Sequence, residues 1–552
     1  MEESTSFLPI EPSNFDLIVV GTGLPQSIIA SAASAAGKSV LHLDPNPFYG
    51  SHSASLPLDD LVSFLKTHSE SQTQSQSEAQ PLPQIFSGDG NCVSIPLLTR
   101  PLYSSVEINS YSSDLIEASR RFNLDLAGPR VFLCSDSMID LILRTGINQY
   151  MEFKAMEASF LSDAEGKLES VPDSRSAIFK NRTLSLPEKN QLMKFFKLVQ
   201  EHFGNDGEGY KISEEDLRSP FVNFLTKMGL SEKLKLIILY TIVMADHDQT
   251  NMEVCRDVVD TKSGINGLAF YHSSIGRFPN ANGAIIYPIY GQGELPQAFC
   301  RRAAVKGCIY VLRMPIASVL MDKDGGTYNG IKLGSGQELF SSQLILEPHY
   351  TIPSTLTPAE QVAASHGANL SDTKEKVVRG ICITKNSLYP GVANCLVFFP
   401  PRSLYPEQIT TVRVLQLSSN VAACPSGMFV TYLSAKCGNA VEGKKLLNEA
   451  INALFCVPLS GNSEKENLHE HTVGKPCLLW SVLYIQELTK FQGAFQSITY
   501  TAMPDEHLHY NDLLNETEKL FQEMYPNEEF FPKQYPTEDD ICDDICDDDG
   551  GL

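Results

Sequence analysis

Residues 15–44 read FDLIVVGTGLPQSIIASAASAAGKSVLHLD, and this stretch decides the fold of the 552-residue chain. The apolar run 15–20 predicts a buried β-strand, and the small-residue run 26–36 predicts a helix that packs closely on a sheet. A second apolar run, 39–43, ends at Asp44. A strand, a glycine-rich turn, a helix and a second strand in this order predict a βαβ unit of an α/β fold.

The turn of this unit keeps only two of the three glycines of a dinucleotide-binding loop. Gly21 and Gly23 stand where the turn tightens and the backbone approaches a pyrophosphate, and Asp44 stands where an acid binds a ribose. Gln26 replaces the third glycine, and Pro25 precedes it. A side chain at that position crowds the helix–strand contact, so we expect a cofactor fold that has lost its cofactor. A bound dinucleotide is the alternative.

Composition restricts the class of protein. The chain has 42% hydrophobic residues and a formal net charge of −23, which argues against nucleic acid or an anionic membrane as a direct ligand. The N-terminal residues lack the basic start and apolar run of a secretory signal, so we expect a cytosolic protein. The thirteen cysteines include no Cys-x-x-Cys pair, which gives a disulfide framework or a zinc ribbon little support.

Pattern changes along the chain predict its organisation. Residues 13–135 and 250–535 are expected to form one discontinuous α/β domain, with a low-complexity insertion at 57–100 that is rich in Ser and Gln. A helical domain is expected at 136–249, inserted into the α/β domain. The acidic run at 536–552 is expected to be a disordered, solvated tail.

Other motifs give catalysis by this chain little support. The loop that precedes Glu294 lacks the Gly-Lys-Ser/Thr ending of a phosphate-binding loop, so it is expected to be a turn that presents Glu294 and Arg301 on a protein-binding surface. His469 and His471 have no third ligand nearby in sequence, and we assign no metal site. No Gly-x-Ser-x-Gly elbow occurs.

Three separated blocks resemble one family. Residues 16–51 (DLIVVGTGLPQSIIASAASAAGKSVLHLDPNPFYGS) resemble the first block of the Rab GDP-dissociation inhibitor and Rab escort protein superfamily. The segments RRFNLDLAGPRVF (120–132) and INQYMEFKAME (147–157) resemble its second block, and YPIYGQGELPQAFCRRAAVKG (287–307) resembles its third. The resemblance implies an FAD-binding-like α/β fold with several sheets and a smaller inserted helical domain, and no bound cofactor.

Two features are closer to the escort branch of the superfamily. Residues 171–196 (VPDSRSAIFKNRTLSLPEKNQLMKFF) resemble the escort segment that docks on Rab geranylgeranyl transferase, and residues 475–488 and 516–532 resemble the escort C-terminal region. This implies a non-catalytic subunit that binds GDP-bound, unprenylated Rab GTPases, presents their C-terminal cysteines to the catalytic α/β heterodimer and delivers the prenylated Rab to a membrane. The alternatives are a GDP-dissociation inhibitor that recycles prenylated Rabs and, from another class, an FAD-dependent oxidoreductase.

The resemblance also implies the positions that contact the Rab. At the positions of Ile309 and Val311 the dissociation inhibitor has a Thr and a Met, so an apolar contact is retained here and a hydroxyl hydrogen bond is not. The implied Rab-binding residues are Tyr49, Arg120, Arg121, Glu294, Arg301, Ile309 and Val311.

The segment that resembles the transferase-docking region differs from the escort pattern at one position. Phe179 is present, but Asn190 stands eleven residues later where escort proteins carry an Arg. The change removes a charge and up to five hydrogen-bond donors. The geranylgeranyl group needs an apolar pocket, because each buried CH₂ contributes about 0.8 kcal/mol. The helical domain is the expected source of that pocket.

The substitution Asn190→Arg should strengthen binding to the catalytic heterodimer, because it restores the missing guanidinium. A binding titration of both forms against the purified heterodimer measures the gain. Equal dissociation constants would remove this position from the docking surface.

Overall fold

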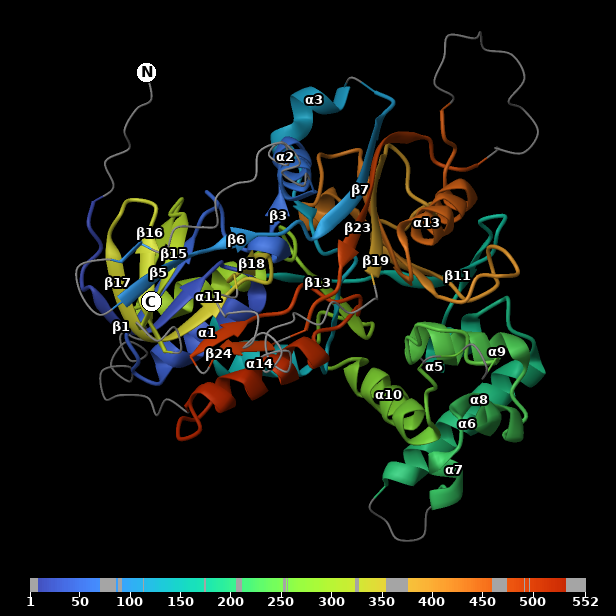
Figure 1. Ribbon diagram of the computed structural model, residues 1–552. Helices are drawn as coiled ribbons and strands as arrows, with labels where there is room; N and C mark the ends of the chain where they lie inside the picture. The colour runs from blue at the N-terminus through green and yellow to red at the C-terminus, as the bar shows by residue number, and fades with distance from the viewer. Residues whose placement is uncertain are drawn as a thin grey trace, which may run out of the picture.

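The structure is a computed structural model, and it describes residues 8–532 except 70–85, 88–91, 113, 173–174, 205–210, 252–254, 256, 323–326, 354–375, 459–473, 491 and 496. Two large β-sheets and a helical unit make up this part of the chain, with the helical unit projecting at the lower right of Figure 1. The predicted α/β class with several sheets is confirmed. Within the described residues, no helix combines the length and hydropathy needed to cross a lipid bilayer.

The predicted βαβ unit is present. Strand β1 (Asn14–Val20) leads through the glycine turn into helix α1 (Leu24–Ala35), and β2 (Val40–Asp44) lies parallel to β1. Pro25 lies in the first turn of α1, where its missing N–H costs no helical hydrogen bond. The last four residues of β1 are fully buried, as expected for a parallel strand covered on both faces.

Strands from distant parts of the chain complete the first sheet. Strand β17 (Glu338–Leu346) pairs in parallel with β1, with Asn14 opposite Phe340. The order is β14-β2-β1-β17-β16-β15-β5-β4, and β25 adds to β17 and pairs with β24. The remaining bounds are β4 Phe86–Ser87, β5 Cys92–Pro96, β14 Ile309–Leu312, β15 Ile316–Asp322, β16 Tyr328–Leu333, β24 Gln492–Phe495 and β25 Ile498–Tyr500.

The second sheet has the order β12-β11-β20-β21-β22-β19-β23-β7. Its face packs against helix α13 (Ala440–Leu454), whose buried residues share a core with the strands. The bounds are β7 Tyr103–Ser110, β11 Ala158–Ser162, β12 Leu168–Ser170, β19 Lys376–Thr384, β20 Cys395–Phe399, β21 Val412–Ser418, β22 Phe429–Cys437 and β23 Leu478–Glu487.

Short strands connect the two large sheets. A three-stranded sheet has the order β10-β13-β9, and β3 pairs with β8 and β6 with β18. The bounds are β3 Ser55–Leu56, β6 Leu98–Thr99, β8 Leu124–Asp125, β9 Phe132–Leu133, β10 Phe153–Ala155, β13 Ile285–Pro288 and β18 Tyr350–Thr351. Helices outside the helical unit are α2 Leu58–Ser69, α3 Asp114–Ala118, α4 Ser137–Arg144, α11 Glu294–Val305 and α14 Asn511–Met524.

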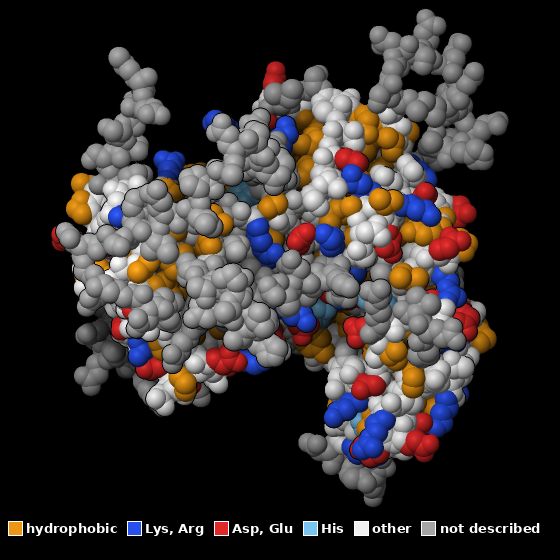
Figure 2. Space-filling view, viewed as in Figure 1, with side chains coloured by type: hydrophobic (Ala, Val, Ile, Leu, Met, Phe, Trp, Pro, Cys, Tyr) orange, Lys and Arg blue, Asp and Glu red, His pale blue; other side chains and the backbone are white. Residues whose placement is uncertain are grey.

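The helical unit is built from short helices around apolar side chains. Its longest helix, α6, begins with a capping box between Ser185 and Glu188. Lys/Arg and Asp/Glu side chains alternate over the face of the unit shown in Figure 2, so the net negative charge is not concentrated there. The helices are α5 Arg175–Lys180, α6 Leu186–Phe203, α7 Glu214–Arg218, α8 Phe221–Lys227, α9 Glu232–Leu236, the π-helix Ile237–Ile242 and α10 Thr261–Ser274.

The described part of the 57–100 region differs from the predicted low-complexity insertion. It contains α2, whose Leu61 and Leu65 are fully buried, and strands β5 and β6. The amphipathic repeat of α2 is short and interrupted by acids, so composition concealed it. Most of the Ser/Gln-rich stretch and the predicted acidic tail at 536–552 lie outside the described residues.

The elements also divide the chain differently from the predicted helical domain at 136–249. Strands β10, β11 and β12 fall inside that range but belong to the sheets, and β11 pairs in parallel with β20. Helix α10 lies beyond the range and packs against α6, α7 and α8. Strand pairing between distant segments leaves no local periodicity, which explains the difference.

A buried guanidinium joins the second sheet to two loops. Arg379 in β19 is 1% exposed, and its Nε donates to Gln486 Oε1 at 2.7 Å. Its Nη1 donates to the carbonyls of Ala127 and Gly128 at 2.9 and 3.0 Å, and its Nη2 donates to the carbonyl of Asp505 at 2.7 Å. Because a buried carbonyl without a donor is costly, this one side chain stabilises several segments at once.

Replacing Arg379 with Met should lower the free energy of unfolding by roughly 3 kcal/mol or more, because several buried acceptors lose their donors. Urea unfolding followed by circular dichroism measures the change. The control, Arg144→Met on the exposed face of α4, should shift the midpoint little. Similar midpoints for the two variants would contradict the role given to Arg379.

Candidate functional site

The predicted sequence-distant residues Tyr49, Glu294 and Arg301 line one pocket of about 340 Å³. Tyr150 and Tyr310 also line it, and we call it the platform pocket. The segment after β2 contributes Tyr49, and helix α11 contributes both charged side chains. The structure therefore brings together three of the seven residues that the resemblance implied.

Aromatic rings orient the charged groups of the platform pocket. The guanidinium of Arg301 lies over the Tyr150 ring, 4.5 Å from its centroid, in a cation–π contact. The Tyr49 ring meets the Tyr310 ring nearly edge-on, with 6.0 Å between centroids. Partial burial raises the pKa of Glu294. An acid, a cation and a phenol are thus presented together from a packed scaffold.

A buried carboxylate holds the turn that starts α11. Asp125, 1% exposed, accepts hydrogen bonds from Ser55 Oγ (2.6 Å), the Tyr287 hydroxyl (2.6 Å) and the Gln292 backbone N–H (2.9 Å). Burial raises the pKa of Asp125, although these donors act in the opposite direction. Asp125, in the second sequence block, therefore holds the turn before α11, which belongs to the third block.

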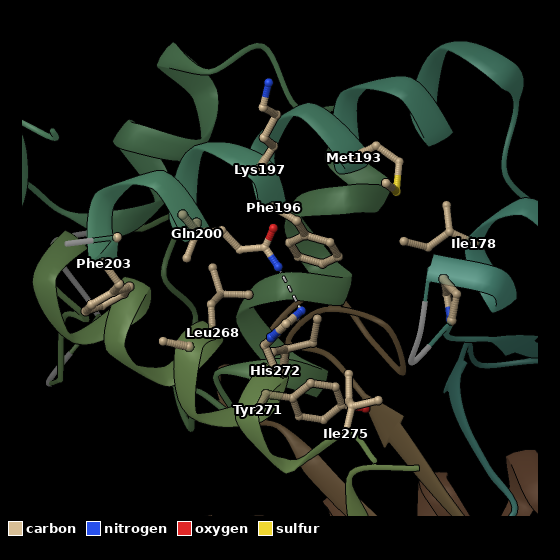
Figure 3. A pocket seen from close by; sticks show the side chains of 15 residues that line it. Ile178, Met193, Phe196, Lys197, Gln200, Phe203, Leu268, Tyr271, His272 and Ile275 are labelled. Atoms are coloured by element: carbon tan, nitrogen blue, oxygen red, sulfur yellow. Dashed lines mark hydrogen bonds between the residues drawn. The ribbon is translucent and has the colours of Figure 1, made fainter. Parts of the chain in front are cut away.

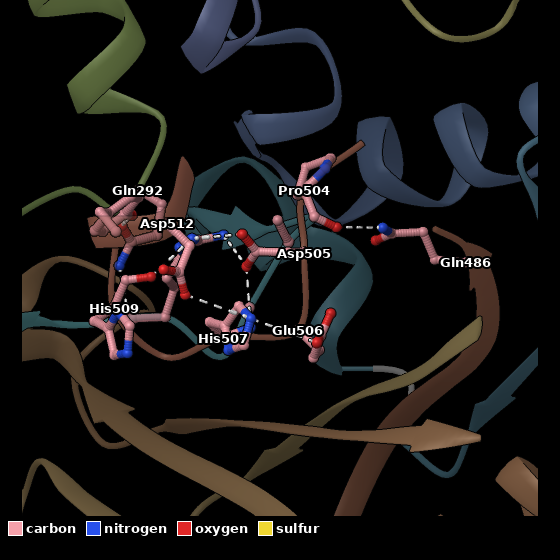
Figure 4. A network of polar contacts seen from close by, with 12 residues as sticks. Gln292, Gln486, Pro504, Asp505, Glu506, His507, His509 and Asp512 are labelled. Atoms are coloured by element: carbon pink, nitrogen blue, oxygen red, sulfur yellow. Dashed lines mark hydrogen bonds and ion pairs between the residues drawn. The ribbon is translucent and has the colours of Figure 1, made fainter. Parts of the chain in front are cut away.

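The turn itself requires close backbone approach. Gly291 has φ +100°, and a Cβ at this position would collide with Ser55 Oγ. Gln292 is 5% exposed; its Nε2 donates to the Arg130 carbonyl at 2.6 Å, and its Oε1 accepts from the Tyr510 hydroxyl. Figure 4 shows Gln292 beside the segment that carries His507 to Asp512.

The other implied Rab-binding residues lie elsewhere. Arg120 and Arg121 are exposed in the 3₁₀ turn Ser119–Arg121, which packs against α2 and does not line the platform pocket. Ile309 and Val311 in β14 are half-buried against the core on the other side of the first sheet.

Two lining residues were not predicted as site residues. Tyr310 lies between two predicted positions of β14, and because side chains alternate along a strand it faces the pocket while its neighbours do not. Its place in the alternation is a signal that sequence reasoning could have used. Tyr150 lies in the segment 147–157 of the second sequence block, and no sequence signal connects it to Arg301.

The acid of the dinucleotide loop is already satisfied within the chain. Asp44 Oδ2 accepts from the Thr22 N–H (2.8 Å), the Thr22 hydroxyl (2.6 Å) and Ser51 Oγ (2.8 Å), and Oδ1 accepts from the Asn46 N–H (2.7 Å). Burial, together with the nearby charge of Glu347, raises the pKa of Asp44 to about 6.

The chain's own side chains occupy the cradle. A Cβ on Gly21, at φ +88°, would collide with the carboxylate of Glu347, and a Cβ on Gly23 would collide with Gln26 Oε1. Burial acts to raise the pKa of Glu347, but His349 and His52 outweigh it and bring the pKa to about 2, so the carboxylate is ionised at neutral pH. The Glu347 carboxylate against this loop would repel the negatively charged pyrophosphate of a dinucleotide. Glu347 and Gln26 therefore do not fit a bound dinucleotide.

The helical unit contains an apolar pocket of about 670 Å³. In Figure 3, Ile178, Met193 and Phe196 surround it from α5 and α6, and Leu268 and Ile275 lie on the α10 side. One polar contact crosses it: the side chains of Gln200 and His272 are hydrogen-bonded at 3.0 Å. The volume is in the range of ligand pockets.

The two predicted transferase-binding residues lie near one another on the helical unit. Phe179 in α5 is 65% exposed, and Asn190 is exposed on α6. Lys189 Nζ donates to the Phe179 carbonyl at 3.0 Å, which ties the end of α5 to α6. Leu186, 76% exposed, begins α6 and adds a second large apolar side chain to this surface, which sequence reasoning did not single out.

Comparisons with known proteins agree with this architecture. The family model described as "GDP dissociation inhibitor" matches residues 11–81 and 83–458. A solved structure of Rab GDI from Plasmodium falciparum superposes with a TM-score of 0.65 at 18% identity, covering 94% of this chain and 99% of that one. At this identity the match shows the fold alone.

Two curated relatives match nearly the whole chain. The chain is 52% identical to "Rab escort protein 1" of Arabidopsis thaliana, over 95% of each sequence. It is 25% identical to "Rab proteins geranylgeranyltransferase component A 2" of Mus musculus, over 96% of this chain and 98% of the relative. The family model and the relatives together show that the chain belongs to the GDP dissociation inhibitor family.

Proposed function

We propose that the chain is a Rab escort protein, a non-catalytic accessory subunit of Rab geranylgeranyl transferase. It binds GDP-bound, unprenylated Rab GTPases, presents their C-terminal cysteines and delivers the prenylated product to membranes, acting from the cytosol. The observation that carries the proposal is the 52% identity to an escort protein over 95% of both sequences. The three surfaces described above support the proposal as candidate contacts for the Rab, the geranylgeranyl group and the catalytic heterodimer.

The platform pocket is the proposed Rab contact. Tyr49, Glu294 and Arg301 offer a ring, an anion and a cation around one concavity, which suits a protein surface that carries both charge signs. Asp125 fixes the turn that carries the two charged residues, so little ordering entropy is lost on binding. Arg120, Arg121, Ile309 and Val311 lie outside the platform pocket, and their part in Rab binding stays a prediction from the resemblance.

The pocket between α6 and α10 is the proposed site for the geranylgeranyl group. Its lining is predominantly apolar, with Phe196 and Leu268 on facing helices. Burial of a 20-carbon isoprenoid there is favourable by about 0.8 kcal/mol per CH₂.

The exposed surface of Phe179, Leu186 and Asn190 is the proposed docking site for the catalytic heterodimer. Large apolar side chains at 65% and 76% exposure, on adjacent helix ends, are the kind of anchors that protein interfaces bury. This surface is what distinguishes the escort function from that of a dissociation inhibitor, which recycles prenylated Rabs without the transferase. A flavin oxidoreductase is disfavoured by Glu347 and Gln26 in the cradle.

Reconstituted prenylation tests the escort function. A Rab–GDP complex, the catalytic heterodimer and geranylgeranyl diphosphate are combined with and without this chain, and transfer is followed by mass spectrometry of the Rab. We expect transfer only when the chain is present. A matched reaction with a Rab GDP dissociation inhibitor in its place should give none. Transfer that does not depend on the chain would refute the escort function.

Replacing Arg301 with Ala should weaken binding to a GDP-bound Rab roughly fivefold or more, because truncation of a central interface Arg costs above about 1 kcal/mol. Titration against a Rab loaded with a fluorescent GDP analogue measures the dissociation constant of each variant. Lys306→Ala, at the exposed C-cap of the same helix and outside the platform pocket, is the matched control. Equal affinities for the two variants would exclude the platform pocket as the Rab contact.

A further inference from the structure

A cluster of metal-ligand side chains lies where the strands of the first sheet end. His52 lies in the 3₁₀ turn Ser51–Ser53, and Glu347 and His349 directly follow β17. One ligand atom of each lies within 4.8 Å of the others, and all three side chains are buried, at 5%, 1% and 7% exposure. His52 is far from Glu347 and His349 in sequence, so only the fold reveals the cluster.

Atoms in this cluster have no hydrogen-bond partner among the described residues. They are Glu347 Oε1, His52 Nε2 and His349 Nδ1. His349 Nδ1 lies 3.2 Å from Glu347 Oε2, within ion-pair range but without good hydrogen-bond geometry. A buried, unpaired carboxylate oxygen next to unpaired imidazole nitrogens is costly, and a cation between them removes the cost.

His52 is held in the orientation that a metal ligand needs. Its Nδ1 is 3.0 Å from the Tyr103 hydroxyl, which leaves Nε2 directed at the cluster. Ligating imidazoles in proteins are characteristically fixed by such a partner on the other ring nitrogen.

A second acidic cluster shows what a compensated site looks like. Asp246, Glu506 and His507 also come within ligand distance of one another. There, however, Lys436 Nζ lies 3.1 Å from Asp246 Oδ2 and 2.5 Å from Glu506 Oε1, and Arg413 pairs with Asp246. Two cations already neutralise that cluster. For Glu347, His349 is the only ion-pair partner recorded in the described residues.

We propose that His52, Glu347 and His349 bind a structural Zn²⁺ ion. Two imidazoles and one carboxylate are an established zinc ligand set in which a water takes the fourth position, and His68 is the next nearest imidazole, with its ring centroid 5.8 Å from that of His52. The ion would neutralise Glu347 and join the end of β17 to the turn that follows Tyr49. A metal would then stiffen the edge that carries the platform pocket, a role separate from Rab or transferase binding.

Metal analysis of the full chain, purified without chelators, tests the site. We expect about one zinc per chain, loss of the zinc on dialysis against a chelator and recovery on addition of ZnSO₄, with a higher unfolding temperature in the reloaded protein. Glu347→Gln and His349→Ala should abolish both the stoichiometry and the zinc-dependent rise. The variant His507→Ala, in the compensated cluster, should retain both.

If His349→Ala fails to fold, Glu347→Gln still tests the site, because the substitution keeps the volume of the side chain. Substitution with Co²⁺ gives an independent readout, because cobalt bound by nitrogen and oxygen ligands absorbs visible light. Wild-type protein that neither takes up zinc nor gains stability from it would overturn the proposal and leave an isolated Glu347–His349 ion pair. A Glu347→Gln variant with wild-type zinc content would overturn it equally.

Discussion

The parallel pairing of β1 with β17 is the contact on which the rest of the structure depends. It joins strands that are far apart in sequence, with Asn14 opposite Phe340 and Val19 opposite Ile345. Because parallel strands end at the same edge, the pairing brings Glu347 against Gly21 and near Asp44. The edge that binds phosphate groups in dinucleotide-binding folds is therefore filled with the chain's own carboxylates and imidazoles.

Much of the local structure was predictable from the sequence, and the long-range structure was not. The βαβ unit was predicted to within two residues because its signals, an apolar strand, Gly21 and a small-residue helix, are contiguous. The position of Glu347 was not predictable, since nothing near it in the sequence indicates a neighbour at Gly21. For the same reason β11 was assigned to the helical domain, although it pairs with β20.

For the candidate site, too, some features could be predicted from the sequence and others could not. The pairing of Tyr49 with Glu294 and Arg301 in one pocket followed from a resemblance between sequence blocks, because no periodicity connects them. Tyr150 was missed because its contact with Arg301 is a ring face meeting a cation across two segments. The roles of the predicted residues in binding remain predictions that the experiments above address.

The hydrogen bond between Gln200 and His272 has a consequence for how the helical pocket fills. This solvent-exposed hydrogen bond joins α6 to α10, and a bond of this kind contributes about 0.5–1.5 kcal/mol. If the geranylgeranyl group occupies this pocket as proposed, burial of about two of its methylene groups offsets that cost. Under the proposed function, entry of the lipid would break this hydrogen bond, and its release would allow the bond to re-form.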